Sequence, residues 1–167
     1  QTILRALDRV PGVNSRFIEL FTRDVYAYLT RTKIRERIDA IVAAGIGRQP
    51  CAVLAHSLGT IVAYNVLRSR TGDANCPRLV TVGSPLGIKA IKGKLDQPLT
   101  HPPCVQHWFN ALDSRDVVAL YPLDPANFDV HPPIENKTDI QNGTENRHGI
   151  TGYLADAVVA EKVVEFL

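Results

Sequence analysis

Ser57 is the residue whose surroundings most clearly suggest chemistry. It stands in the segment Ala55-His-Ser-Leu-Gly59, between a short apolar run and a helical apolar pattern. This arrangement is typical of a serine on a tight, strained turn between a strand and a helix, where small residues are expected two positions before and after it. A hydroxyl at a helix N-terminus lies where developing negative charge is favoured. The pattern therefore predicts that Ser57 is a nucleophile.

A serine hydroxyl needs a neighbouring base, and the base needs a carboxylate to orient it. His148 lies in a loop before the last predicted helix and is the predicted base. Asp113 and Asp116 both follow the third predicted strand and are the two candidate acids. The remaining histidines are expected in packing, loop or strand positions: His56, His101, His107 and His131.

The elements that must position these residues alternate between strands and helices. This alternation predicts an α/β fold, a mostly parallel sheet with helices on both faces. The predicted strands lie around Val53–Leu54, at Arg78–Gly83, at Val105–Ala111 and near Lys137–Ile140. The predicted helices are Gln1–Val10, Asn14–Leu29, Lys33–Ala44, the segment after Ser57, and Ala155–Leu167.

The bulk composition is that of an ordinary globular domain. The chain has 167 residues, of which 45% are hydrophobic and 22% charged, so a single domain is expected. A net charge of +2 without a basic run argues against a nucleic-acid partner. No apolar stretch approaches the roughly 20 residues of a membrane span.

Several other classes of function lack their sequence signals. Three widely spaced cysteines favour neither a disulfide framework nor a metal site, and they favour the reducing cytoplasm as the location. The histidines are scattered, and no phosphate-binding glycine motif is present, so we expect neither a metal nor a nucleotide cofactor. Ser84, which is followed by Pro85, is expected in a turn near the rim of the site rather than as a second nucleophile.

Four segments together resemble the α/β-hydrolase superfamily, and within it the bacterial lipase- or esterase-like serine hydrolases. The resemblance implies one domain over residues 1–167, with 1–32 as a helical N-terminal region and 33–167 as the recognisable core. It also favours Asp116 as the acid, because apolar residues and a proline follow it as they do in lipases; Asp113 stays open as the alternative. The four segments are Ala55–Gly59, Thr81–Gly87, Asn110–Val118 and His148–Tyr153.

The resemblance implies acyl transfer from a small acyl ester or lipid to water, without a cofactor. Ser57 would attack the carbonyl, His148 would carry the proton, and Asp116 would orient His148. The backbone N–H of Leu58, the residue after the nucleophile, would be one donor of the oxyanion hole. A thioesterase or acyltransferase would use the same triad.

The resemblance has one gap. The second oxyanion donor usually comes from a loop after an early strand, and no such strand is predicted before Lys33. We therefore expect either that N-terminal strands are missing from this sequence or that the domain is a minimal relative. Loss of one oxyanion donor typically lowers turnover by about 10²–10³-fold, so a catalytically silent binding module is the alternative from a different class.

Overall fold

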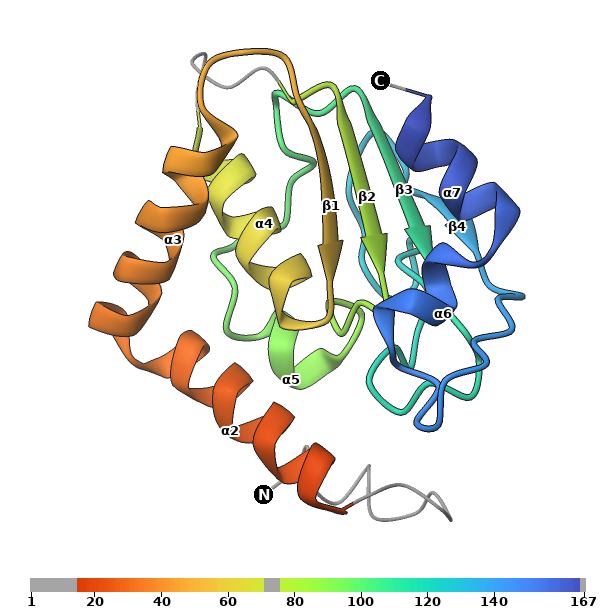
Figure 1. The fold of residues 1–167 in the computed structure, drawn as a ribbon. Helices are drawn as coiled ribbons and strands as arrows, with labels where there is room; N and C mark the ends of the chain where they lie inside the picture. The colour runs from red at the N-terminus through yellow and green to blue at the C-terminus, as the bar shows by residue number, and fades with distance from the viewer. Residues whose placement is uncertain (1–14, 71–75, 166–167) are drawn as a thin grey trace.

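The computed structural model describes residues 15–70 and 76–165, with side chains from residue 19 onward. The helix predicted over Gln1–Val10 lies outside the described residues. The described part is an α/β structure around a parallel sheet, with the C-terminal helices on one side of the view and the N-terminal helices on the other (Figure 1).

The sheet has four strands in the order β1-β2-β3-β4, and all neighbouring pairs are parallel. The prediction of a mostly parallel sheet is therefore confirmed. Strand β2 is buried over four of its five residues, as expected for a strand covered on both faces. The strands are β1 (Ala52–His56), β2 (Arg78–Val82), β3 (His107–Ala111) and β4 (Glu135–Lys137).

Helices flank the sheet and pack on it through two separate apolar clusters. Leu79 and Trp108 belong to the cluster that includes the buried face of α4, whereas Val80 and Phe109 belong to the cluster with Tyr153 of α6 and Val159 of α7. Because successive strand residues point to opposite faces, the two clusters lie on opposite sides of the sheet. The helices are α2 (Ser15–Thr30), α3 (Thr32–Ile46), α4 (Leu58–Ser69), α5 (Lys89–Lys92), α6 (Ile150–Leu154) and α7 (Ala157–Val164).

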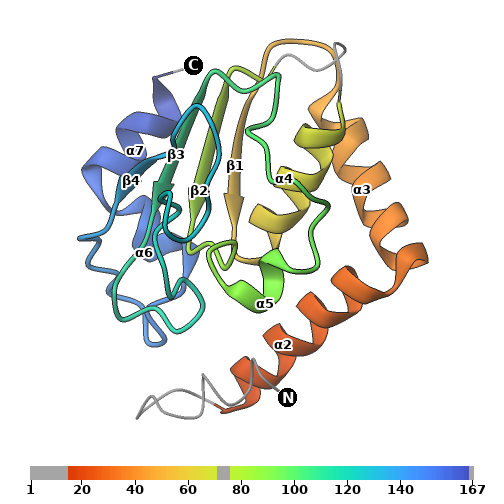
Figure 2. The same ribbon diagram turned by 180° about the vertical axis from the view of Figure 1, so that it is seen from behind.

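Helix α2 crosses the end of the molecule toward which the strands point (Figures 1 and 2). Its Val25 and Tyr28 are almost fully buried. The Tyr28 hydroxyl donates to Asp39 Oδ1 of α3 at 2.7 Å and accepts from Asn65 Nδ2 of α4 at 3.0 Å. One buried tyrosine thereby connects three helices and fixes α2 beside the carboxyl ends of the strands.

Two predicted elements differ from those observed. The last strand was expected near Lys137–Ile140, but β4 begins at Glu135 and ends at Lys137, because Asn136 fixes the segment by accepting from Asn110 Nδ2 and donating to two backbone carbonyls. The closing helix predicted over Ala155–Leu167 corresponds to α7, which begins at Ala157, and the short helix α6 before it was not predicted. Asp156 separates them, since its carboxylate caps α7 by accepting from the N–H groups of Val158 and Val159.

Candidate active site

Ser57 occupies the turn between β1 and α4. Its backbone has φ 56° and ψ −128°, a conformation that costs a non-glycine residue on the order of 1–3 kcal/mol. The Ser57 N–H donates to the Val82 carbonyl oxygen at 3.3 Å, and the Ser57 carbonyl oxygen accepts from the Thr60 N–H and hydroxyl at 3.0 and 2.7 Å. These bonds tie the strained turn to β2 and to the first turn of α4.

The small residues on either side of Ser57 do not have equal roles. Ala55 is buried in the core on the α4 side of the sheet. At Gly59, by contrast, an added Cβ would meet no described atom within 4 Å. The expectation that Gly59 must be small for lack of space is therefore wrong for the described part of the chain, because this residue lies on an exposed part of the first turn of α4.

The structure brings Ser57, His148 and Asp116 into one hydrogen-bonded series. His148 Nε2 lies 2.8 Å from Ser57 Oγ, and His148 Nδ1 lies 2.7 Å from Asp116 Oδ2. A carboxylate can only accept, so Nδ1 carries the proton and donates it to Asp116. Nε2 is then the acceptor for the Ser57 hydroxyl. This is the tautomer in which His148 can take a proton from Ser57.

Asp116 is buried, and both of its oxygens accept hydrogen bonds. Oδ1 accepts from the N–H groups of Val118 and Ala119 at 2.8 and 3.3 Å. Oδ2 accepts from His148 and also from the Tyr153 hydroxyl, the latter at 2.6 Å. Four donors therefore hold one carboxylate in a single orientation toward the imidazole.

Asp113, the alternative acid, faces different partners. Burial alone would raise the pKa of Asp113, but hydrogen bonds from the Arg115 side chain and from the N–H groups of Arg115 and Asn142 lower it overall. Its oxygens lie 2.8 Å from the Arg115 N–H and 2.8 Å from the Asn142 N–H. Asp113 thus connects the loop after β3 to the loop that carries His148, and Asp116 is the aspartate that the structure brings to the imidazole.

Polar side chains fix the loop that presents His148. The His148 N–H donates to Asn146 Oδ1 at 3.1 Å, and Asn142 Nδ2 donates to the Gly149 carbonyl oxygen at 2.9 Å. Arg147 has φ 57°, in the left-handed region, and its guanidinium donates to the Asn142 carbonyl oxygen at 2.8 Å. These hydrogen bonds, together with the strained backbone of Arg147, hold the histidine in one orientation.

His56 packs against His148 rather than acting on Ser57. A carbonyl oxygen can only accept, so His56 Nε2–H donates to the His148 carbonyl oxygen, at 2.6 Å. The two rings lie 4.6 Å apart between centroids. Burial lowers the pKa of His56, and the neighbouring His148 lowers it further. The structure therefore agrees with the predicted packing and hydrogen-bonding role of His56.

Gly83 and Tyr153 border the imidazole and were given no role from the sequence. Gly83 has φ 59°, and a Cβ there would lie 3.2 Å from His148 Nδ1 and 3.1 Å from Tyr153 Cε2. Sequence spacing gave no signal for either contact, because strand β2 and helix α6 meet only through the fold. Ser84, expected at the rim, is buried below the turn, and its hydroxyl lies 2.9 Å from Thr60 Oγ1.

The Leu58 N–H, which the sequence predicted as an oxyanion donor, lies at the start of α4. Leu58 is the first residue of α4, so its N–H belongs to the helix terminus that lacks an intrahelical partner. Over residues 15–70, no strand precedes β1. The loop from which the second donor was expected is therefore not among the described elements. On the α2 side of the site, the ring of Phe21 lies 6.2 Å from the His148 ring, measured between centroids.

The described residues contain no group of three or more His, Cys, Asp or Glu residues suited to a metal ion. Cys51, Cys76 and Cys104 are free thiols. Burial, together with the nearby Cys51 and Cys104, raises the pKa of Cys76 to about 12, and burial also raises the pKa of Cys104. The thiols of Cys76 and Cys104 are therefore poorly suited to metal ligation or nucleophilic attack near neutral pH, because both roles need the thiolate.

Fold and site together define an α/β protein with a serine, a histidine and an aspartate in hydrogen-bond series at the carboxyl edge of a parallel sheet. No family model, no curated protein and no solved structure matches the chain. None of the described helices has both the length and the apolar character that crossing a membrane requires.

Proposed function

We propose that this chain is a serine hydrolase of the α/β-hydrolase type that cleaves carboxylic esters through an acyl-enzyme. The observation that supports this proposal best is the series Ser57 Oγ, His148 Nε2, His148 Nδ1 and Asp116 Oδ2, with separations of 2.8 and 2.7 Å across the two hydrogen bonds. Ser57 lies 91 positions and Asp116 lies 32 positions from His148 in the chain, yet both bond its ring. This arrangement of nucleophile, base and acid is the one that supports nucleophilic catalysis.

In the first half of the proposed reaction, Ser57 Oγ attacks the ester carbonyl carbon and its proton passes to His148 Nε2. The carbonyl oxygen becomes an oxyanion, which the Leu58 N–H and the N-terminus of α4 stabilise. Asp116 stabilises the imidazolium that forms. His148 then gives the proton to the leaving alkoxide oxygen as the C–O bond breaks, which leaves an acyl group on Ser57 and releases the alcohol.

In the second half, His148 Nε2 removes a proton from water as the water oxygen attacks the acyl carbonyl carbon. The oxyanion forms again at the same N–H group. His148 returns the proton to Ser57 Oγ as the acyl bond breaks, and the carboxylic acid leaves. Proton and electron pairs balance without a metal ion or a cofactor.

A thioester, or an acceptor other than water, would use the same three residues, because substrate preference depends on the shape of the pocket. One observation favours a silent binding module as the second candidate: among the described residues, Leu58 alone supplies an assigned oxyanion donor. The reactivity of Ser57 distinguishes the two candidates, because a hydrolase has an activated serine and a silent module does not.

The test is labelling with a fluorophosphonate probe, followed by peptide mapping of the adduct. We expect one adduct, on Ser57, in the wild-type protein. It should disappear in Ser57→Ala, and His148→Ala should lose it at the same probe concentration. His148→Ala removes a buried ring, so circular dichroism must show that both variants remain folded before the labelling results are compared.

Ser84→Ala is the matched control. Its hydroxyl is buried near the same turn but bonds Thr60 and accepts from the Leu86 N–H instead of facing His148. Labelling of Ser57 should persist in this variant. An absence of labelling in folded wild-type protein would support the silent module, and an adduct on any other serine would contradict the assigned nucleophile.

A further inference from the structure

Tyr153 makes the shortest hydrogen bond to Asp116. Its hydroxyl lies 2.6 Å from Oδ2, the oxygen that also accepts from His148 Nδ1 at 2.7 Å. The side chain comes from α6, five residues after His148, and it is fully buried. One carboxylate oxygen is therefore shared between the tyrosine hydroxyl and the imidazole.

The direction of this hydrogen bond follows from the neighbours of the tyrosine oxygen. The Asp113 N–H donates to it at 3.3 Å, so the oxygen is already an acceptor on one side. Burial raises the pKa of Tyr153, and the Asp116 charge raises it further. The phenol therefore keeps its proton near neutral pH, and that proton points to Asp116.

The ring cannot easily move away from this contact. Tyr153 lies in the cluster with Val80, Val82, Phe109 and Ala111, on the face of the sheet that α6 and α7 cover. Its Cε2 lies 3.1 Å from the place where a Cβ on Gly83 would stand. The ring extends from α6 and packs against the end of β2, and this packing keeps its hydroxyl within hydrogen-bond distance of Asp116.

We propose that Tyr153 is a positioning residue for the reaction, which holds Asp116 Oδ2 in the plane of the imidazole and shares the carboxylate charge with it. The inference rests on the proposed function for its kinetic consequences only. A hydrogen bond to the carboxylate spreads its charge, so Asp116 attracts the proton on His148 less strongly than a carboxylate without Tyr153 would.

Other titratable groups near the pair do not replace this contact. His56 of β1 packs on the His148 ring and bonds the His148 carbonyl oxygen. Asp113 is engaged by Arg115 and by the Asn142 N–H. The Arg147 guanidinium bonds the Asn142 carbonyl oxygen. Among these side chains, Tyr153 is the one whose donor faces the carboxylate that orients His148.

The experiment compares wild-type protein with Tyr153→Phe. For hydrolysis of a short-chain nitrophenyl ester, we expect the acid limb of kcat/KM to move to higher pH by about half a unit or more, with kcat on the plateau reduced about tenfold. Without substrate, the low-field proton NMR signal of the His148 Nδ1–H should move downfield, because the bond to Asp116 strengthens. A purely structural role would lower the melting temperature and leave both readouts unchanged.

A second variant keeps the test independent of folding. Replacing Tyr153 by 3,5-difluorotyrosine retains the shape and strengthens the donor, so the acid limb and the NMR signal should move in the opposite direction. Tyr28→Phe is the matched control, because the Tyr28 hydroxyl also donates to a carboxylate, at 2.7 Å, away from His148. It should shift neither readout.

Two outcomes are kept apart by this design. If the wild-type protein hydrolyses no ester and is not labelled, the proposed function fails, whereas the NMR signal still reports on Tyr153. If the acid limb and the signal stay fixed in both Tyr153 variants, the positioning role is overturned, whatever the activity.

Discussion

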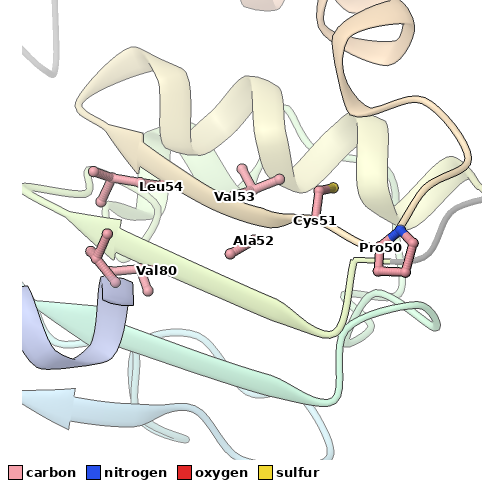
Figure 3. Close-up of a pocket in the computed structure, with 7 residues that line it drawn as sticks. Pro50, Cys51, Ala52, Val53, Leu54 and Val80 are labelled. Carbon is pink, nitrogen blue, oxygen red and sulfur yellow. The ribbon is translucent and has the colours of Figure 1, made fainter. Parts of the chain in front are cut away.

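The carboxyl end of strand β1 and its outer edge differ in how many hydrogen bonds hold them. At its carboxyl end, the turn at Ser57 is held by bonds to Val82 and Thr60, and the imidazole beside it is fixed by a carboxylate and a loop. Along its outer edge, β1 pairs with no other strand of the described residues, and a hollow of about 420 Å³ is lined by residues 50–54 together with Val80 and Val163 (Figure 3). Leu54 is 36% exposed there, whereas Leu79 on the neighbouring strand is fully buried.

This difference indicates that Ser57, His148 and Asp116 are held in place by hydrogen bonds among the loops at the carboxyl ends of the strands. The groups that orient the triad belong to the segments after β1, β2, β3 and β4, and each bonds another of these segments directly. The apolar outer edge contributes to none of those bonds. Changes at the carboxyl end should therefore alter reactivity, changes in the buried strands should alter stability, and changes at the outer edge should do little of either.

The largest effect is expected from Asp116→Asn. An amide facing Nδ1 favours the wrong tautomer of His148, which lowers kcat by about 10⁴-fold in other triads. The measurement is kcat for ester hydrolysis, or the rate of fluorophosphonate labelling, on folded protein.

Asp113→Asn is the control for that prediction. It weakens the pair with Arg115 and the bond from Asn142, so it should lower the melting temperature while reducing the labelling rate less than tenfold. Equal losses of activity in both variants would contradict the separate roles of the two aspartates.

Gly83→Ala should give the second-largest effect at the carboxyl end. The backbone there has φ 59°, and the new methyl group would stand 3.2 Å from the imidazole, so both the turn and the ring must shift. We expect about 10²-fold lower kcat/KM, in line with the sensitivity of reaction geometry to small displacements. Gly59→Ala is the matched control, since a Cβ there meets no described atom within 4 Å. Normal activity of Gly83→Ala would contradict the close packing around His148.

Leu79→Ala and Leu54→Ala compare the buried strand with the outer edge. Removing a fully buried leucine typically costs about 2–5 kcal/mol of unfolding free energy, because a cavity is left. Leu54 already faces solvent in part, so we expect a loss below about 1 kcal/mol. Urea denaturation measures both, and equal losses would show that the outer edge is covered in solution.

The sequence predicted those parts of the molecule that depend on local patterns. The apolar run before Ser57 and the helical spacing after it predicted β1, the turn and α4, since each lies within a few residues. A mostly parallel sheet was predicted from the alternation of strands and helices. The described sheet is parallel throughout, although no helix lies between β3 and β4. His148 was placed by its position before the last helix, and the structure brings its ring to Ser57.

What the sequence could not predict depends on contacts distant along the chain. The spacing of the residues did not choose between Asp113 and Asp116, because both follow the third strand. The family resemblance favoured Asp116, and Asp116 is the aspartate that bonds His148 in the structure. The Tyr153 contact joins α6 to the loop after β3. Helix α6 was missed because it is only five residues long and contains Gly152, and the start of α7 was placed two residues early because the capping role of Asp156 was not recognised.

The smallest expected effect concerns acid stability. Burial lowers the pKa of His101 below its ordinary value of about 6.5, so the unfolded chain binds a proton before the folded protein does as the pH falls. The part of the stability that is linked to the neutral form of His101 is therefore fully present above about pH 6.5 and decreases as the pH falls below it. His101→Gln should flatten the fall in melting temperature between pH 7 and pH 5.5. His131→Gln, which changes an exposed ring, should leave the slope as it is. Parallel slopes for wild type and His101→Gln would contradict this source of acid sensitivity.

The most direct test of the account is a burst experiment with a nitrophenyl ester, followed by acid quench and mass spectrometry of the peptide that contains Ser57. The account predicts a burst of nitrophenol close to one equivalent per chain and an acyl group on Ser57, both absent in Ser57→Ala. A folded protein that shows no burst and no acylated Ser57, or that carries the acyl group on another residue, would contradict it.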